Sequence, residues 1–320
     1  MNKSAENYEI LISPMYYIGK LIWNVLRWFI LISISFIILY PLIYMLSMSV
    51  RSSSDFFDVT VVWIPNNFTL DNFRRVLFEI ELYIPMLHTF LLSTFCTFLQ
   101  LFVTSLAGYS FARYKFKGRN FLFALVLVTI MMPSQMVSIP NYIMMKNLDF
   151  FGIIRLITGS PSPINLLNSY LSFLLPAALG QGLRAGLFIL IFRQFYRGLP
   201  VELEEAAMID GCGHTKTYFS IMLPNARTPL IICGTFSFVW YWGDYFTPYV
   251  FFVTIRTLAV QLMDFHFILD KYLPLSQHNF YYKIPLKQAA CIISIIPLIL
   301  LFVLTQRFFV KGIDKTGIVG

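Results

Sequence analysis

The polar residues that could do chemistry gather in one segment of an otherwise apolar chain. In order, the segment reads Glu205-Ala206-Ala207, three residues, Gly211, nine residues, and Ile221-Met222-Leu223-Pro224. Pro200 suits the first turn of a helix, and the glutamates that follow it favour the positive end of that helix. The two alanines allow another surface to approach closely, and Gly211 permits a turn. Residues 198–227 therefore predict two short helices around a glycine hinge.

Other reactive side chains are scattered along the chain. The histidines (His88, His214, His266 and His278) show no metal-ligand or nucleophile–base spacing. The cysteines (Cys96, Cys212, Cys233 and Cys291) lack a C-x-x-C spacing and are expected to pack as small apolar groups. No phosphate-binding G-x4-G-K-[ST] motif is present. We therefore expect no catalytic residue, metal site, cofactor or ATP site in this chain.

Composition indicates a membrane protein. Hydrophobic residues make up 58% of the chain and charged residues 12%, whereas a soluble domain carries about a quarter charged residues. Because roughly 20 apolar residues cross a bilayer as a helix, the uncharged runs predict an all-α fold with six spans. These are 22–47, 86–111, 121–145, 167–192, 229–253 and 286–308. The first run is too long for a signal peptide and lacks a small-residue cleavage site.

Basic residues are distributed unevenly between the two sides that these spans would separate. One side holds fourteen of the 24 basic residues: Lys3, Lys20, Arg27, Arg113, Lys115, Lys117, Arg119, Arg193, Arg197, Lys216, Arg227, Arg307, Lys311 and Lys315. Segments on the other side are longer and carry acidic residues such as Asp55, Asp58 and Asp264. The positive-inside rule places the basic side in the cytoplasm. We expect a cytoplasmic tail at 1–20, a membrane domain at 21–310 and a cytoplasmic tail at 311–320.

Helix breakers interrupt two of the predicted spans. Pro133 lies in the third, and Gly182 and Gly186 in the fourth, where their spacing permits close helix approach. The 147–166 loop, rich in proline and glycine, either contacts a partner or is a tolerated surface insertion.

The pattern in residues 198–227 resembles the cytoplasmic coupling motif of the membrane subunits of bacterial ABC importers. Residues 112–119, 193–200 and 240–244 are similar to the carbohydrate branch of these permeases, although Gly243 stands where asparagine is commoner. Residues 306–320 resemble the C-terminus of maltose-type second permeases. The resemblance extends over residues 20–320.

This resemblance implies a type I importer permease fold and a role as half of a transport path for an oligosaccharide. It assigns ATPase coupling to Glu205, Ala206, Ala207, Gly211, Ile221, Leu223 and Pro224. The implied partners are a second, non-identical permease, an ABC ATPase dimer that binds ATP and Mg²⁺, and an extracytoplasmic substrate-binding protein. The implied location is the bacterial cell membrane, in contact with lipid and not with nucleic acid.

Two groups of residues are candidates for the transport path. Trp240, Tyr241, Trp242, Asp244 and Tyr245 offer aromatic faces and hydrogen-bonding groups of the kind that bind sugars. A packing cluster or an interfacial aromatic belt is the alternative.

Arg184 lies inside the predicted fourth span, where a guanidinium costs at least about 2.5–3.5 kcal/mol. It should therefore face water, an acidic side chain or an acidic sugar, unless the span begins near Leu187 and leaves Arg184 at the outer surface.

Two other classes of protein fit the sequence less well. An ion-gradient-driven transporter needs ionisable groups within its spans, and here Arg184, Asp244 and Lys287 are nearly the whole supply. That class also leaves the 198–227 pattern unexplained. A membrane enzyme would need a reactive constellation that the sequence does not show.

Overall fold

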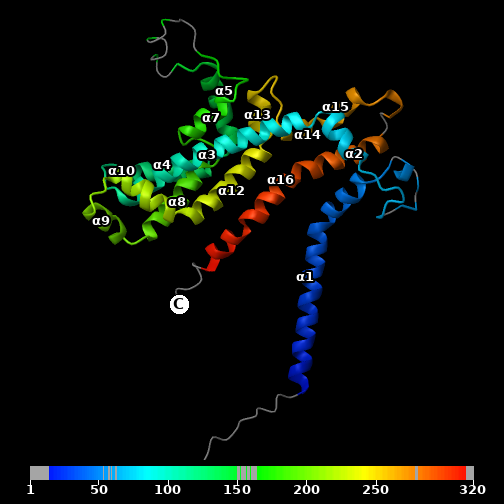
Figure 1. Ribbon diagram of the computed structural model, residues 1–320, viewed down its shortest axis with the longest axis horizontal. Helices are drawn as coiled ribbons and strands as arrows, with labels where there is room; N and C mark the ends of the chain where they lie inside the picture. The colour runs from blue at the N-terminus through cyan, green and yellow to red at the C-terminus, as the bar shows by residue number, and fades with distance from the viewer. Residues whose placement is uncertain are drawn as a thin grey trace, which may run out of the picture.

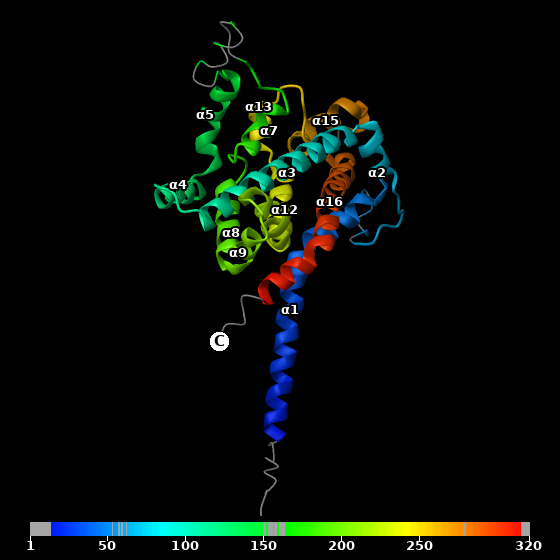
Figure 2. The same ribbon diagram turned by 60° about the vertical axis from the view of Figure 1, so that its left-hand side comes forward.

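The computed structural model describes residues 14–314, except 53, 57, 59, 62, 150–151, 153–155, 157–158, 160–163 and 278–279. The described residues form helices and two isolated β-bridges, without a β-strand, which confirms the all-α prediction (Figures 1 and 2). The first elements are α1 (Pro14–Ser49), η1 (Ser54–Phe56), α2 (Asp71–Arg74), the π-helix η2 (Arg75–Glu79), α3 (Tyr83–Arg113), α4 (Arg119–Met131), α5 (Ser134–Lys146) and α7 (Leu171–Ala178). Next come α8 (Ala185–Gly198), α9 (Glu202–Ile209), α10 (His214–Thr217), the π-helix η4 (Tyr218–Met222) and α11 (Leu223–Asn225). The last are α12 (Arg227–Gly243), α13 (Phe246–Phe251), α14 (Leu258–Met263), α15 (Phe265–Tyr272), η5 (Leu275–Gln277) and α16 (Phe280–Asp314).

Three of these helices are long and apolar enough to cross a bilayer unaided. They are Tyr17–Ser49 in α1, Tyr83–Arg113 in α3, and Tyr281–Phe309 in α16. They correspond to the predicted first, second and sixth spans. At about 1.5 Å per residue, the 36 residues of α1 extend about 54 Å, well beyond the roughly 30 Å hydrocarbon layer.

The predicted third span is a bent pair of helices. Arg119–Met131 and Gln135–Lys146 meet at 107°. The bend lies at Pro133, whose ring fixes its backbone and removes an amide donor from the helix ladder. Counted as one broken span, the pair is a fourth candidate among the described residues.

The predicted fourth and fifth spans are also interrupted. The fourth consists of α7 and α8, with 8 and 14 residues, separated by the irregular segment 179–184. The fifth consists of α12 and α13, with 17 and 6 residues, separated at Asp244. No one of these helices has the length of a full span. Length and hydropathy of the described helices therefore support up to four spans, and the count of six stays a prediction.

Helix α3 runs through the centre of the bundle and packs against α7, α8 and α12. Two glycines allow close packing within the bundle: Gly182 against α3 and α12, and Gly186 of α8 against α4. A Cβ atom added to Gly186 would lie 2.9 Å from the carbonyl oxygen of Val126, and one added to Gly182 would collide with the side chains of Gln100 and Tyr241. The prediction that these glycines serve helix packing is confirmed.

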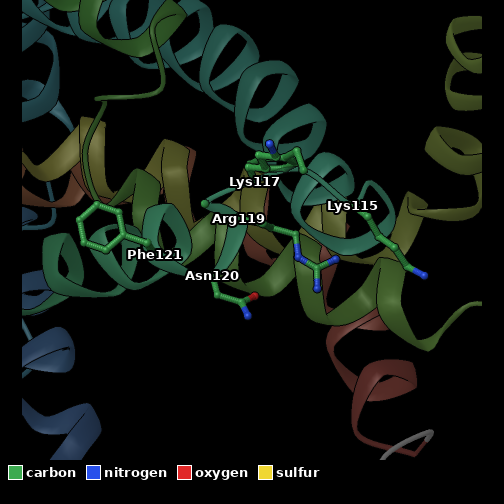
Figure 3. A pocket seen from close by; sticks show the side chains of 7 residues that line it. Lys115, Lys117, Arg119, Asn120 and Phe121 are labelled. Carbon is green, nitrogen blue, oxygen red and sulfur yellow. The ribbon is translucent and has the colours of Figure 1, made fainter.

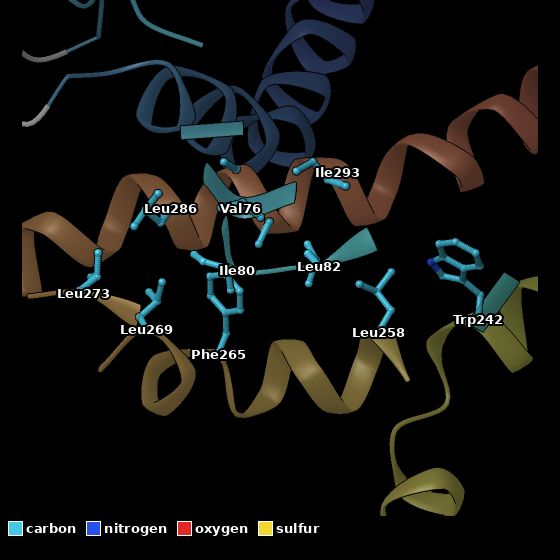
Figure 4. Packing of buried hydrophobic residues seen from close by; sticks show 12 residues of the cluster. Val76, Ile80, Leu82, Trp242, Leu258, Phe265, Leu269, Leu273, Leu286 and Ile293 are labelled. Atoms are coloured by element: carbon cyan, nitrogen blue, oxygen red, sulfur yellow. The ribbon is translucent and has the colours of Figure 1, made fainter. Parts of the chain in front are cut away.

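A buried apolar cluster joins α16 to the segment before α3. Val76, Ile80 and Leu82 are at most 3% exposed and lie between α16 and the α14–α15 segment (Figure 4). Leu258 and Phe265 close the cluster from the α14–α15 side. At about 25 cal/mol per Å² of apolar surface removed from water, such contacts fix the end of the molecule that carries α2 and α15.

A β-bridge between Leu148 and Ile164 closes the base of the 147–166 loop. Most of the loop lies outside the described residues, so its predicted contact with a partner stays a prediction.

Candidate coupling loop and transport path

The segment from 198 to 227 folds as two helical arms joined by a turn. Helix α9 carries Glu202, Glu204 and Glu205 in its first turn, where the helix dipole favours negative charge. The chain reverses at Gly211, whose φ of +79° is accessible to glycine and strained for other residues. Helix α10, η4 and α11 form the returning arm. In Figure 1, α9 and α10 lie at the end of the bundle remote from α2 and α15.

The predicted coupling residues divide between the surface and the interior. Glu205, Ala206, Gly211 and Pro224 are exposed, whereas Ala207 is buried. Ile221 and Leu223 are half-buried and pack against a buried cluster that includes Tyr109, Tyr196 and Tyr218.

Sequence reasoning missed two apolar residues beside Glu205 and Ala206. Ile209 is 86% exposed and Met208 is 42% exposed. The tip of α9 is therefore a small apolar surface edged by acids, a composition suited to docking against another protein. The signal was available, because two apolar residues directly precede Asp210 and the turn at Gly211.

The interior side of α9 is held by an ion pair that sequence reasoning also missed. Glu204 Oε1 lies 2.8 Å from Arg113 Nε, with both side chains 10% exposed. Arg113 Nη2 also donates a 2.7 Å hydrogen bond to the carbonyl oxygen of Leu199. Glu204 and Ala207 are one helical turn apart, so helical periodicity could have placed both on the inward face.

Hydroxyl groups tie the returning arm to two helices of the bundle. Tyr218 donates a 3.0 Å hydrogen bond to Ser105 Oγ, and a 2.8 Å bond joins that oxygen to the Tyr196 hydroxyl. The ring of Tyr109 lies against those of Tyr196 and Tyr218, at centroid distances of 5.4 and 5.1 Å. The 198–227 loop is therefore linked by these contacts to α3, through Ser105 and Tyr109, and to α8, through Tyr196.

Arg184 lies at the break in the predicted fourth span. It is exposed, adopts φ +54°, and comes just before α8. Its guanidinium carbon lies 5.0 Å from the centre of the Trp240 ring, a cation–π arrangement. Within the described part of the chain, no carboxylate is within ion-pairing distance of it.

A hydrogen-bonded network secures this break to α3 and α12. The Tyr241 hydroxyl donates to Gln100 Oε1 at 2.6 Å and accepts from the Leu183 amide at 3.1 Å. The Gln100 amide in turn donates to the Leu183 carbonyl oxygen at 2.7 Å. The network satisfies backbone groups that the interrupted helix leaves unpaired, which is a requirement for irregular backbone within a membrane.

The aromatic residues of the predicted path point in different directions. Trp240 is half-buried and stacks between Phe188 and Phe236, at centroid distances of 5.4 and 5.7 Å. Tyr241 and Trp242 are each 4% exposed, and the Trp242 indole donates to the Ser294 carbonyl oxygen. In this structure the latter two serve packing, while Trp240 shares a face with Arg184.

Asp244 and Tyr245 lie just beyond α12. Asp244 Oδ1 accepts from the amides of Phe246 and Thr247 at 3.1 and 3.2 Å and so caps α13. Its other oxygen, Oδ2, is buried and has no hydrogen-bond partner among the described residues. Tyr245 is 50% exposed.

Metal-ligating side chains do not cluster in the described part of the chain: no group of three or more His, Cys, Asp or Glu residues could hold an ion. The four cysteines are free thiols, of which Cys96 and Cys233 are buried.

The described residues thus combine a two-armed loop at 198–227 with interrupted spans and long apolar helices. Residues 100–315 match the model of the binding-protein-dependent transport system inner membrane component. The chain belongs to this family. It is therefore a multi-pass component of the cell membrane, and the resemblance noted from the sequence is confirmed.

Individual members of the family are similar over most of the chain. The arabinooligosaccharides transport system permease protein AraQ of Halalkalibacterium halodurans is 30% identical, over 92% of this chain and 98% of that protein. The maltodextrin transport system permease protein MdxG of Bacillus subtilis is 29% identical, over 90% and 93%.

A solved structure shows the same fold. A chain of a bacterial ABC transporter involved in the import of the acidic polysaccharide alginate superimposes with a TM-score of 0.73 and 20% identity. The match covers 93% of this chain and 100% of that one. The family match and this superposition together give the chain an ABC importer permease fold.

Proposed function

We propose that this chain forms half of the membrane path of an ATP-driven carbohydrate importer. The observation that carries the proposal is the 198–227 loop. Its outer face exposes Glu205, Ala206 and Ile209, while its inner face is joined to α3 by the buried Arg113–Glu204 pair. An element that protrudes and is also joined firmly to the bundle can transmit movement from a partner into the membrane.

The partner at this loop would be an ABC ATPase dimer, which binds ATP and Mg²⁺ itself. Glu205 would pair with a basic group of that subunit, and the apolar tip of α9 would enter an apolar cleft. The movement would pass to α3 through Arg113 and to α8 through Tyr218, Ser105 and Tyr196. This chain would catalyse no covalent reaction.

A second, non-identical permease would cover part of the exposed apolar surface. The membrane window of α1 is 0% buried within this chain; α1 contacts α16, and most of its length extends away from the bundle in Figures 1 and 2. Lipid would cover the rest.

Six spans with cytoplasmic termini are the topology we propose. The interrupted pairs α7–α8 and α12–α13 would each count as one span alongside the four candidates. Both ends of the described chain, at the start of α1 and the end of α16, point away from the end that carries α2 and α15 (Figure 1). An extracytoplasmic binding protein would meet that opposite end.

Arg184 would select an acidic sugar. It is exposed beside Trp240, an arrangement that offers a cation next to an aromatic ring. Within a bilayer such a charge needs a compensating group. The alginate importer named above, which has the same fold, moves an acidic polysaccharide, and AraQ and MdxG are named for oligosaccharides.

Reconstitution with the cognate ATPase and binding protein tests the energy source. ATP inside proteoliposomes should drive substrate movement, and an inactive ATPase should stop it. An imposed proton or sodium gradient without ATP should drive none. Uptake sustained by the gradient alone would favour an ion-driven secondary transporter instead.

The same preparation tests charge selection. Arg184→Gln should reduce ATP-driven transport of an acidic oligosaccharide more than that of a neutral one of equal length. Arg256→Gln is the matched control, because Arg256 pairs with Asp264 away from Trp240. Equal losses for both sugars would assign Arg184 to packing, and unchanged transport of both would place it outside the path.

A further inference from the structure

The turn between α3 and α4 carries positive charge that the rest of the chain does not neutralise. Lys115 and Lys117 are exposed, and Arg119 is half-buried. Arg113, at the start of this turn, forms an ion pair with Glu204. Among the described residues, no carboxylate lies within ion-pairing distance of the other three.

These side chains line a cavity. An open pocket of about 470 Å³ is lined by Lys115, Phe116, Lys117, Gly118, Arg119, Asn120 and Phe121. Figure 3 shows the basic side chains and Asn120 fanning out from one short stretch of chain, with the Phe121 ring directed away from Lys115. The arrangement offers cations and an amide donor on one open surface, which is the chemistry that recognises a phosphate.

Helix α8 adds to the positive field behind this cavity. Arg193 lies just beyond the predicted fourth span, with its guanidinium carbon 3.8 Å from the centre of the Phe123 ring of α4. Arg193 and Arg197 are one turn apart on α8, and Arg119 begins α4, which packs against α8. The basic residues of the two helices are thus close enough to repel one another, and an anion would relieve that repulsion.

The apolar residues that follow decide which anion fits. Phe121, Leu125 and Val128 are 68%, 47% and 51% exposed and lie at i, i+4 and i+7 on α4. They form one stripe that begins at the cavity and continues along the helix. A soluble phosphate would contact the cavity alone, whereas one anionic phospholipid would place its headgroup in the cavity and its acyl chains along the adjoining stripe.

We propose that the α3–α4 turn is a binding site for the headgroup of an anionic phospholipid, held by Lys115, Lys117 and Arg119. Its acyl chains lie along the exposed stripe of α4. A zwitterionic phospholipid does not replace the anionic one. Its headgroup carries a cation of its own, and the site is already positive.

Native mass spectrometry of the full-length protein in a neutral detergent tests the site. Dioleoyl phosphatidylglycerol and dioleoyl phosphatidylcholine are titrated separately, and the bound lipid is counted. The wild-type protein should retain phosphatidylglycerol preferentially. The triple variant Lys115→Gln, Lys117→Gln, Arg119→Gln should bind it at least about tenfold more weakly.

The control removes three basic residues elsewhere on the same predicted side: Lys216→Gln, Arg227→Gln and Arg307→Gln. It should keep the preference. Single variants at Lys115 and Lys117, exposed residues without an ionic partner, each give a smaller loss and remain available if the triple variant does not fold. Equal binding of the two lipids by the wild-type protein, or equal losses in both triple variants, would overturn the site.

A soluble competitor separates lipid from free phosphate. Glycerol 1-phosphate at millimolar concentration should not displace phosphatidylglycerol, because it lacks the acyl chains that cover α4. Displacement of phosphatidylglycerol by glycerol 1-phosphate at that millimolar concentration would mean that the cavity binds soluble phosphates. The lipid assignment would then be wrong.

Discussion

Arg113 Nε, at the end of α3, lies 2.8 Å from Glu204 Oε1, in the first turn of α9. The neighbouring Glu205 is exposed on the other side of the same helix. One glutamate therefore fixes the 198–227 loop to the bundle, while the next is exposed, where we propose that it meets a partner. This division of roles between adjacent acids is the structural basis for the first two predictions.

Removing Glu204 should destabilise the protein. Glu204→Ala leaves the Arg113 guanidinium largely buried and unpaired, a change that costs about 3 kcal/mol. The unfolding midpoint of the purified protein should fall. Glu202→Ala, on the exposed side of α9, should stay within about 0.5 kcal/mol of wild type. The double exchange Arg113→Glu, Glu204→Arg should recover part of the loss, and no recovery would argue against a direct pair.

Substitutions on the exposed face of the 198–227 loop should affect coupling and not folding. Glu205→Lys reverses the charge that we propose pairs with the ATPase, and Gly211→Pro forces a φ near −65° where the turn needs +79°. Both variants should insert normally yet lose substrate-stimulated ATP hydrolysis in the assembled transporter. Glu79→Lys, a charge reversal at an exposed residue of η2 at the opposite end, should retain it. Wild-type rates in the two loop variants would contradict the coupling assignment.

Tyr241→Phe should loosen the break in the fourth span. The change leaves Gln100 Oε1 and the Leu183 amide without a partner in a buried site, at a cost of about 1–3 kcal/mol. Thermal unfolding in detergent measures the loss. Tyr245→Phe is the matched control, because Tyr245 is half exposed. If both variants unfold at the same temperature as wild type, the network does not hold the break.

Low pH should destabilise the segment that precedes α2. Burial opposes ionisation of Asp55, but hydrogen bonds from the backbone and side chain of Asn67, with a further one from Ser52, outweigh it and lower its pKa below the ordinary 3.8. A depressed pKa stabilises the folded segment above about pH 4, and that contribution disappears as the pH falls through the folded value.

Hydrogen exchange of residues 48–82 should therefore be slow near neutral pH and speed up relative to the rest of the chain below about pH 4. Asp55→Ala should show the fast exchange already at neutral pH. Glu79→Gln, an exposed member of the Arg75 pair, should behave as wild type. An unchanged pattern in Asp55→Ala would show that this carboxylate does not close the segment.

Topology can be tested from outside the cell. In a cysteine-free background, cysteine at position 117 or 216 should be protected from an impermeant thiol reagent, and cysteine at position 58 should react. Position 162, expected outside as well, lies beyond the described residues. Labelling of position 216 in intact cells would contradict the proposed orientation.

The amino-acid sequence by itself determined the class of protein and the place of the 198–227 loop. Long uncharged runs can be recognised without a structure, because a bilayer demands about 20 apolar residues in each spanning helix. The Glu205–Pro224 pattern is equally local: its proline, glycine and small residues act through the conformations of their own backbone. Both features could therefore be read along the chain.

Tertiary structure alone decided which residues face each other. The pairing of Arg113 with Glu204 joins residues far apart in sequence, as does the bond between Tyr241 and Gln100. Residues 240–242 have similar aromatic character, yet Trp240 meets Arg184 while Trp242 packs against α16. Consecutive residues of a helix point about 100° apart, and only the neighbouring helices determine which direction is a core and which is an open face.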